Sequence, residues 1–213
     1  MTAESMSLVE LLAQGGWSMA PLYLCSVVGL AVFIRKFVEF RSAGVARTEI
    51  LDAVSGSLAE GDFDTVEKAC ATDGTPLGRV MAAAARAVRE TPARASEEAS
   101  RVASNELQSL EAYLPLLSFV AQVAPLFGLL GTVIGMVDLF SGLEAAGQSV
   151  DASTLSSGIW KALLTTAAGL IIAIPCLGGH AWLISMSESL KLRMKDGTTR
   201  IFNRAFGEAK GQG

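Results

Sequence analysis

The sequence lacks charged side chains in three long stretches, and this absence determines its class. Asp, Glu, Lys and Arg are missing from residues 15–34, 112–137 and 162–187. Each stretch is long enough to cross a hydrocarbon core of about 30 Å, because a helix rises about 1.5 Å per residue. Strand-like alternation and paired turn signals are also missing. The sequence therefore predicts an all-α membrane protein with three transmembrane helices.

Residues that build metal centres, disulfide frameworks and catalytic sites are scarce. The three cysteines, Cys25, Cys70 and Cys176, lie far apart without metal-ligand spacing, and His180 is the single histidine. His180 could relay protons, although a lone buried histidine more often makes a structural hydrogen bond. The chain carries no phosphate-binding loop and no nucleophile–base motif. We expect no enzymatic activity, metal, cofactor or nucleic-acid partner.

The distribution of basic residues predicts the orientation in the membrane. No Lys or Arg precedes Arg35, and only Lys161 lies between Arg101 and Lys191. The others form one block after the first uncharged stretch and a second block after the third. Three membrane crossings put both blocks on the same side, which the positive-inside rule identifies as the cytoplasm. We expect a periplasmic N-terminus and a cytoplasmic C-terminus.

These signals divide the chain into seven segments. We expect a periplasmic N-terminus at 1–16, transmembrane helices at 17–38, 112–140 and 158–187, a cytoplasmic helical domain at 39–111, a periplasmic loop at 141–157 and a cytoplasmic tail at 188–213. In the cytoplasmic domain, Asp62 or Asp64 can cap one helix, and Thr91 followed by Pro92 suits the start of another. We expect that last helix to continue into the second transmembrane helix, with a kink at Pro115.

The second and third transmembrane stretches carry small residues at helical spacing. These are Gly128, Gly131 and Gly135 in the second stretch and Gly158 and Gly169 in the third. In lipid, close packing and interhelical hydrogen bonds replace the hydrophobic drive to associate. The two small-residue faces therefore predict tight contacts between helices and assembly into a larger oligomer.

Polar residues within these two stretches could contribute to an ion pathway. Thr132 and Thr166 lie at similar depths, so they could share one level in a helical hairpin. Their hydroxyls could support a water chain or meet a partner's acid, but such threonines often bond the carbonyl one turn back. Near the outer ends lie Asp138 and Lys161, which we expect to pair across the hairpin. No Asp or Glu lies in the central two-thirds of any stretch, so a proton path would need a partner's carboxylate.

Two motifs in these stretches resemble the MotA/TolQ/ExbB proton channel family, most closely its TolQ/ExbB branch. The second stretch carries Ala124-Pro125, Gly128 through Val133 and Gly135-Met136, and the third carries Gly158-Ile159, Ala162-Leu163, Thr165-Thr166 and Gly169-Leu170 through Pro175. The resemblance covers almost the whole chain. It implies a pentamer in the bacterial inner membrane, with helices two and three lining a central pore.

The resemblance also implies a partner and a role for particular residues. A dimer of single-span ExbD/TolR-like proteins would occupy the pore and carry the proton-binding aspartate, so that proton flow performs mechanical work or transport across the cell envelope. Thr132, Thr165 and Thr166 would belong to the pore and proton pathway. Lys161 departs from the family, which commonly has a glutamate there. Two alternatives stay open: a flagellar-type stator or gliding motor subunit, and a non-conducting scaffold.

Overall fold

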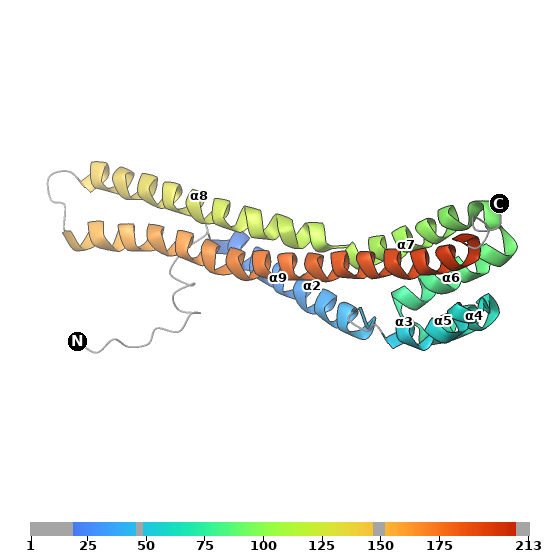
Figure 1. Cartoon of the computed structure of the whole chain (residues 1–213). Coiled ribbons are helices and arrows are strands. Elements are labelled where there is room, and N and C mark those ends of the chain that lie inside the picture. The colour runs from blue at the N-terminus through green and yellow to red at the C-terminus, as the bar shows by residue number, and fades with distance from the viewer. Residues whose placement is uncertain (1–18, 46–48, 147–151, 208–213) are drawn as a thin grey trace. The chain divides into compact units, whose positions relative to one another are not determined.

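The computed structural model describes residues 19–45, 49–146 and 152–207, and all the regular secondary structure in these ranges is helical (Figure 1). The chain divides into two compact units. The membrane unit consists of the described parts of residues 1–34 and 113–181, and the polar unit consists of those of residues 35–112 and 182–213. The all-α class predicted by the sequence is confirmed for this part of the chain.

Among the described residues, three helices are long and apolar enough to cross a membrane. They are α2 (Ala20–Ser42), α8 (Leu114–Ala146) and α9 (Ala152–Gly207). The predicted loop at 141–157 is too long, because α8 continues through Ala146 and α9 begins at Ala152. Loss of hydrophobicity marks the end of a membrane crossing rather than the end of a helix, since a helix can continue into water. The predicted N-terminal segment 1–16 lies outside the described residues.

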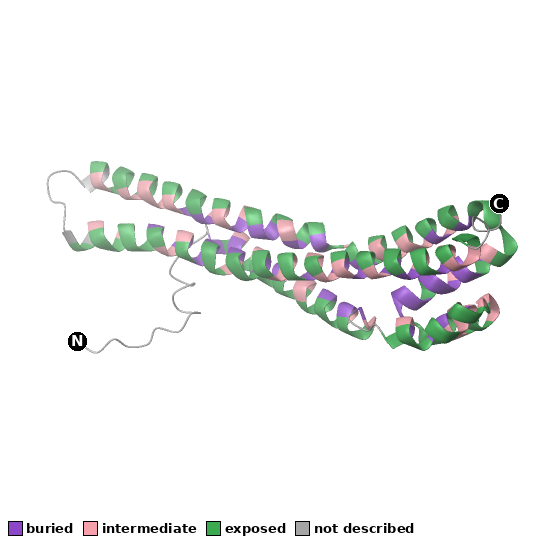
Figure 2. Ribbon diagram, viewed as in Figure 1, coloured by how far each residue is buried: buried purple, intermediate pink, exposed green. Residues whose placement is uncertain are grey.

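Small side chains dominate the core of the membrane unit. Its buried cluster consists of Met19, Leu22, Ala124, Ala168 and Ala173. The buried positions follow the faces on which helices meet, while the outward faces are exposed and largely apolar (Figure 2). A surface of this kind suits hydrocarbon, so the exposed apolar residues here are expected for a membrane protein rather than a sign of instability.

The polar unit is built around α6 (Pro76–Glu90), an alanine-rich helix that is buried over most of its length. It packs against α5 (Phe63–Asp73) and α7 (Ala95–Glu111). The shorter helices α3 (Glu49–Ala53) and α4 (Ser55–Glu60) precede them. Gly197 of α9 also contacts this helix, since a Cβ added there would lie 2.9 Å from Met81 Sδ. Small residues on both partners allow the close approach.

One of the two predicted helix caps forms. Asp62 caps α5 by accepting a hydrogen bond from the Thr65 amide at 3.1 Å, and the bonds from Thr65 hold the pKa of this carboxyl below its usual value. The Thr91–Pro92 start is confirmed in position, but Pro92 opens a 3-10 turn (Pro92–Arg94) that leads into α7, and the Thr91 hydroxyl makes no capping hydrogen bond. A proline suits a tight turn as well as a helix start, so the dipeptide alone does not distinguish them.

The predicted continuous helix through Pro115 is also wrong. Helix α7 ends at Glu111, and Tyr113 has a φ of 70°, which an α-helix cannot accommodate. Helix α8 begins at Leu114, so Pro115 falls in its first turn. Backbone amides there have no carbonyl acceptor within the helix, so a proline costs no hydrogen bond. The proline starts a new helix instead of kinking an existing one.

Polar contacts join three helices at one end of the polar unit. Lys36 of α2 is only 1% exposed, and its ammonium donates to Glu39 at 2.9 Å and to the Ser109 carbonyl at 3.3 Å. Ser187 of α9 donates to Glu111 at 2.6 Å. The buried cation is therefore compensated by a carboxylate and by the negative end of α7.

Candidate ion pathway on helices α8 and α9

Helices α8 and α9 run side by side and are joined by hydroxyl groups (Figure 1). The Thr165 hydroxyl has one hydrogen to donate, and it lies within hydrogen-bond distance of two carbonyls, that of Ala162 at 2.7 Å and that of Gly128 of α8 at 3.2 Å. The Thr166 hydroxyl donates to the same Gly128 carbonyl at 3.1 Å. Two neighbouring threonines of α9 thus converge on one backbone acceptor of α8.

Glycines make this approach possible at the centre of the contact. A Cβ added at Gly128 would lie 2.9 Å from the Thr165 carbonyl oxygen, and one at Gly131 would lie 2.7 Å from Thr165 Oγ1. A Cβ added at Gly169 would lie 2.6 Å from the Ala124 carbonyl oxygen. No side chain fits in these spaces, so the backbones of the two helices touch at Gly128 and Gly169, while the Thr165 side chain packs against Gly131. The structure brings these predicted packing residues together.

The contact is looser toward the connection between the two helices. A Cβ added at Gly135 would lie 3.3 Å from the Ala162 Cβ. At Gly158 an added Cβ would meet a terminal methyl of Leu139 at 2.6 Å, and that side chain can move. These two glycines therefore face their partner helix but do not require glycine as strictly.

The three predicted pathway threonines lie close together along the hairpin but differ in accessibility. Gly128 faces Thr166 and Gly131 faces Thr165, so the two helices run antiparallel and Thr132 lies within about one helical turn of the level of Thr166. Thr132 and Thr166 are half-buried, whereas Thr165 is 2% exposed and enclosed by the helix contact. The Thr132 hydroxyl donates to the Leu129 carbonyl of its own helix at 2.6 Å. Within one chain, only two of the three hydroxyls are near a surface.

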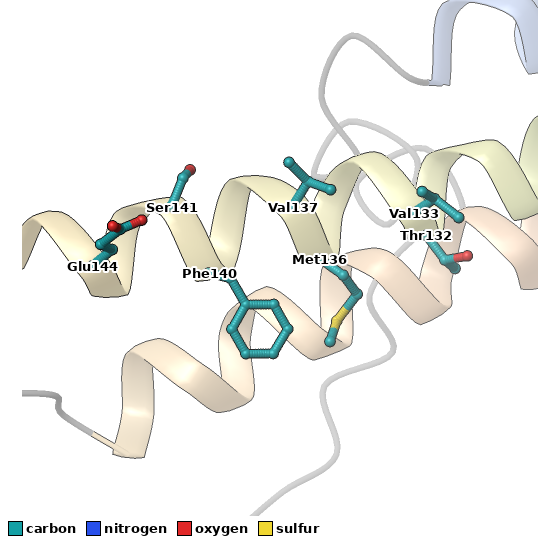
Figure 3. A pocket seen from close by; sticks show the side chains of 7 residues that line it. All are labelled: Thr132, Val133, Met136, Val137, Phe140, Ser141 and Glu144. Carbon is teal, nitrogen blue, oxygen red and sulfur yellow. The ribbon is translucent and has the colours of Figure 1, made fainter.

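A groove of about 580 Å³ on α8 contains Thr132 (Figure 3). Thr132 lies at one end of it and the carboxylate Glu144 at the other, with Ser141 and four apolar side chains between them. Met136 and Phe140 project to one side of the helix and Val137 to the opposite side. Glu144 and Phe140 are not among the site residues predicted from the sequence, although Met136, Phe140 and Glu144 follow one another at intervals of four residues, which indicates a shared helix face.

The predicted ion pair between Asp138 and Lys161 is absent from the described chain. Both side chains are exposed, and none of the ion pairs among the described residues joins them. The contacts at this level are apolar ones, Gly135 with Ala162 and Gly158 with Leu139. The two charged residues flank these contacts and stay available to water or to another chain.

The described residues offer no site for a metal ion. They contain no group of three or more His, Cys, Asp or Glu residues placed to hold one. Cys70 is fully buried in the polar unit, and burial together with the nearby charge of Asp73 raises its pKa to about 11. A thiol that stays protonated near neutral pH is a poor nucleophile and ligand.

Comparison with known proteins finds a family match and several similar proteins. The sequence profile of the MotA/TolQ/ExbB proton channel family matches residues 73–196. The chain is 44% identical over 73 residues to the biopolymer transport protein exbB1 of Vibrio cholerae, covering 34% of this chain and 32% of that protein. It is 28% identical over 183 residues to a putative ExbB-like biopolymer transport protein of Synechocystis, covering 85% of this chain and 72% of the relative.

A further relative comes from the other named branch. The Tol-Pal system protein TolQ of Pseudomonas aeruginosa is 41% identical over 104 residues, which are 49% of this chain and 43% of TolQ. The matches to exbB1 and TolQ thus span less than half of those relatives. The family profile, in contrast, covers more than half of this chain and includes all of α8 and most of α9. The chain is a multi-pass inner-membrane protein, and it belongs to the MotA/TolQ/ExbB proton channel family.

Proposed function

We propose that the chain is the channel-forming subunit of an inner-membrane motor driven by the proton-motive force. The observation that carries this proposal is the α8–α9 hairpin. Its backbones touch at Gly128 and Gly169, and the half-buried Thr132 and Thr166 lie within about one helical turn of each other beside the contact. Repeated around an axis, such hairpins would surround a passage with rings of hydroxyl groups that can donate and accept hydrogen bonds.

The proton-binding acid would come from a second protein. The apolar parts of α8 and α9 contain no Asp or Glu, and Asp138 and Glu144 lie toward the end of α8. We infer that a pentamer of this chain encloses a dimer of single-span ExbD/TolR-like proteins, each of which supplies an aspartate at the level of the threonines. The family and the ExbB and TolQ names of the relatives support this partner.

The energy available to such a motor follows from the membrane potential. One proton crossing about 100 mV releases roughly 2.3 kcal/mol, so several protons would drive each mechanical step. Basic residues follow the uncharged stretches of α2 and α9, at the C-terminal ends of these helices. By the positive-inside rule they support a cytoplasmic C-terminus and a periplasmic N-terminus. Work would then be delivered toward the periplasm through the partner.

Proton flux in reconstituted vesicles tests the proposal. The chain and its single-span partner are purified as one complex, and proton uptake is measured under an imposed potential. We expect the double substitution Thr132→Val with Thr166→Val to abolish uptake while the complex still assembles, because valine keeps the shape of threonine and removes its hydroxyl. Gel filtration with light scattering measures assembly.

Two outcomes would contradict the proposal. If the double variant conducts protons as well as the unaltered complex, the threonines do not belong to the pathway. If the unaltered chain conducts no protons with any single-span partner that it binds, the chain is a scaffold. A stator-type motor would share the pathway and differ in the periplasmic part of the partner.

A further inference from the structure

A second groove lies in the membrane unit, between α2 and α9 and away from the threonines. Its volume is about 410 Å³. Its lining includes Gly29, Leu30 and Phe33 of α2 and Ile171, Pro175 and Gly179 of α9. Apart from Ser26 and Cys176, all the lining residues that the structure describes are glycine or apolar. The groove is therefore hydrocarbon-like and lies within the membrane-crossing parts of both helices.

Close contacts at two glycines form the floor of the groove. A Cβ added at Gly29 would lie 2.7 Å from Cys176 Sγ and 3.2 Å from Val120 Cγ1. A Cβ added at Gly179 would lie 2.7 Å from the Phe33 ring. Helices α2 and α9 are thus in close contact along this floor, so the groove lies over a well-packed helix interface.

The rim of the groove opens onto the exposed apolar surface. Leu30 is 59% exposed and Ile171 is 62% exposed, although both line the groove. Most of α2 is exposed in the same way. In a membrane, the medium outside this rim is lipid hydrocarbon, which enters a groove of matching polarity without loss of hydration.

The size of the groove selects its occupant. Two turns of an α-helix about 10 Å wide occupy about 850 Å³, roughly twice the space available. A helix of a partner or of a second copy could therefore lie across the groove but could not fill it. A single acyl chain is one methylene wide and can bend along the floor, where dispersion contacts with the apolar wall favour it over a gap. We propose that the groove between α2 and α9 binds one lipid acyl chain per protein chain.

Native mass spectrometry of the purified protein tests this site. The protein is incubated with phosphatidylethanolamine and phosphatidylglycerol of the same acyl chains, then transferred to a mild detergent, and the retained lipid is counted. Ser26 is exposed and lines the groove, so Ser26→Phe places a ring where the chain would lie. Val27 is the next residue, is 66% exposed and does not line the groove, so Val27→Phe is the matched control.

We expect the unaltered protein and Val27→Phe to retain one lipid per chain with either headgroup, and Ser26→Phe to lose it. Circular dichroism and gel filtration verify that both variants keep the helical content and size of the unaltered protein. Equal retention by the two variants would overturn the proposal, and so would a strict requirement for one headgroup. A changed oligomeric mass in Ser26→Phe with an unchanged lipid count would make the groove an interface between copies.

Discussion

At the residue scale, Thr165 and Thr166 are adjacent and donate to the same Gly128 carbonyl, yet only Thr165 is enclosed. Interhelical hydrogen bonds in membranes contribute about 0.6 kcal/mol on average, and up to about 1.7 kcal/mol. Because the Thr165 hydroxyl is bonded in a closed site, we expect Thr165→Val to lower the free energy of unfolding by about 1 kcal/mol. Thr166→Val should cost about half as much, since water or lipid can approach its site.

Unfolding of the purified protein in detergent, followed by circular dichroism during an SDS titration, measures both losses. Equal costs for the two substitutions would show that burial does not distinguish these hydroxyls. A larger cost for Thr166→Val would reverse their assignment, with Thr166 as the packing residue and Thr165 as the accessible one.

Residue types predict the chemistry of this region better than they predict accessibility. The small-residue pattern in the sequence identifies Gly128, Gly131 and Gly169, and these residues do lie at the close approach of the two helices. The sequence treats Thr165 and Thr166 as equivalent pathway residues, but successive helical residues point about 100° apart. The spacing of Thr165 from Gly158, Ala162 and Gly169 contains the signal that it faces α8. Reading that signal requires knowing which face of α9 is covered.

At the element scale, the glycines of α8 should differ sharply in their tolerance of alanine. A Cβ at Gly128 would meet backbone atoms of α9, the Thr165 carbonyl oxygen at 2.9 Å and the Thr166 Cα at 3.0 Å. Backbone atoms cannot turn aside, so Gly128→Ala forces the helices apart. We expect a loss of about 2 kcal/mol in unfolding free energy.

Gly142 provides the matched control on the same helix. No heavy atom lies within 4 Å of a Cβ added there, so Gly142→Ala should be neutral or stabilise the helix by about 0.5 kcal/mol. Unfolding in detergent is again the measurement. A loss at Gly142 as large as that at Gly128 would mean that helix propensity, rather than contact with α9, sets the response of α8 to alanine.

Helix boundaries show where sequence patterns stop being informative. Uncharged stretches identify α2, α8 and α9 as membrane-crossing helices, but the polar residues at 141–146 continue α8 instead of forming a loop. The break at Tyr113 has only an indirect signal, the proline two residues later. That proline is compatible both with a kink in one helix and with the start of a new helix, and the packing around Tyr113 decides between them.

At the scale of the whole molecule, the fold class and the family follow from the sequence, while the placement of charge depends on the assembly. Lys161 and Asp138 are exposed and unpaired with each other in one chain. In the proposed ring, each copy would contribute both charges near the outer mouth of the pore. Compared with a mouth that carries the Asp138 carboxylates alone, the added Lys161 cations would lower the local concentration of protons and slow their access to the threonine level.

Neutralising this lysine should therefore increase proton flux. We expect Lys161→Gln to raise uptake by the reconstituted complex roughly threefold at low ionic strength, a modest effect beside the roughly 10- to 1000-fold that strong electrostatic steering can reach. The gain should shrink in concentrated salt, because the Debye length falls from about 30 Å at 0.01 M to about 3 Å at 1 M. Asp138→Asn should act in the opposite direction.

Lys191→Gln removes an exposed lysine of α9 outside the membrane unit and serves as the matched control. A salt-independent change, or a gain equal to that of Lys191→Gln, would mean that the charge at Lys161 does not face the path of the protons.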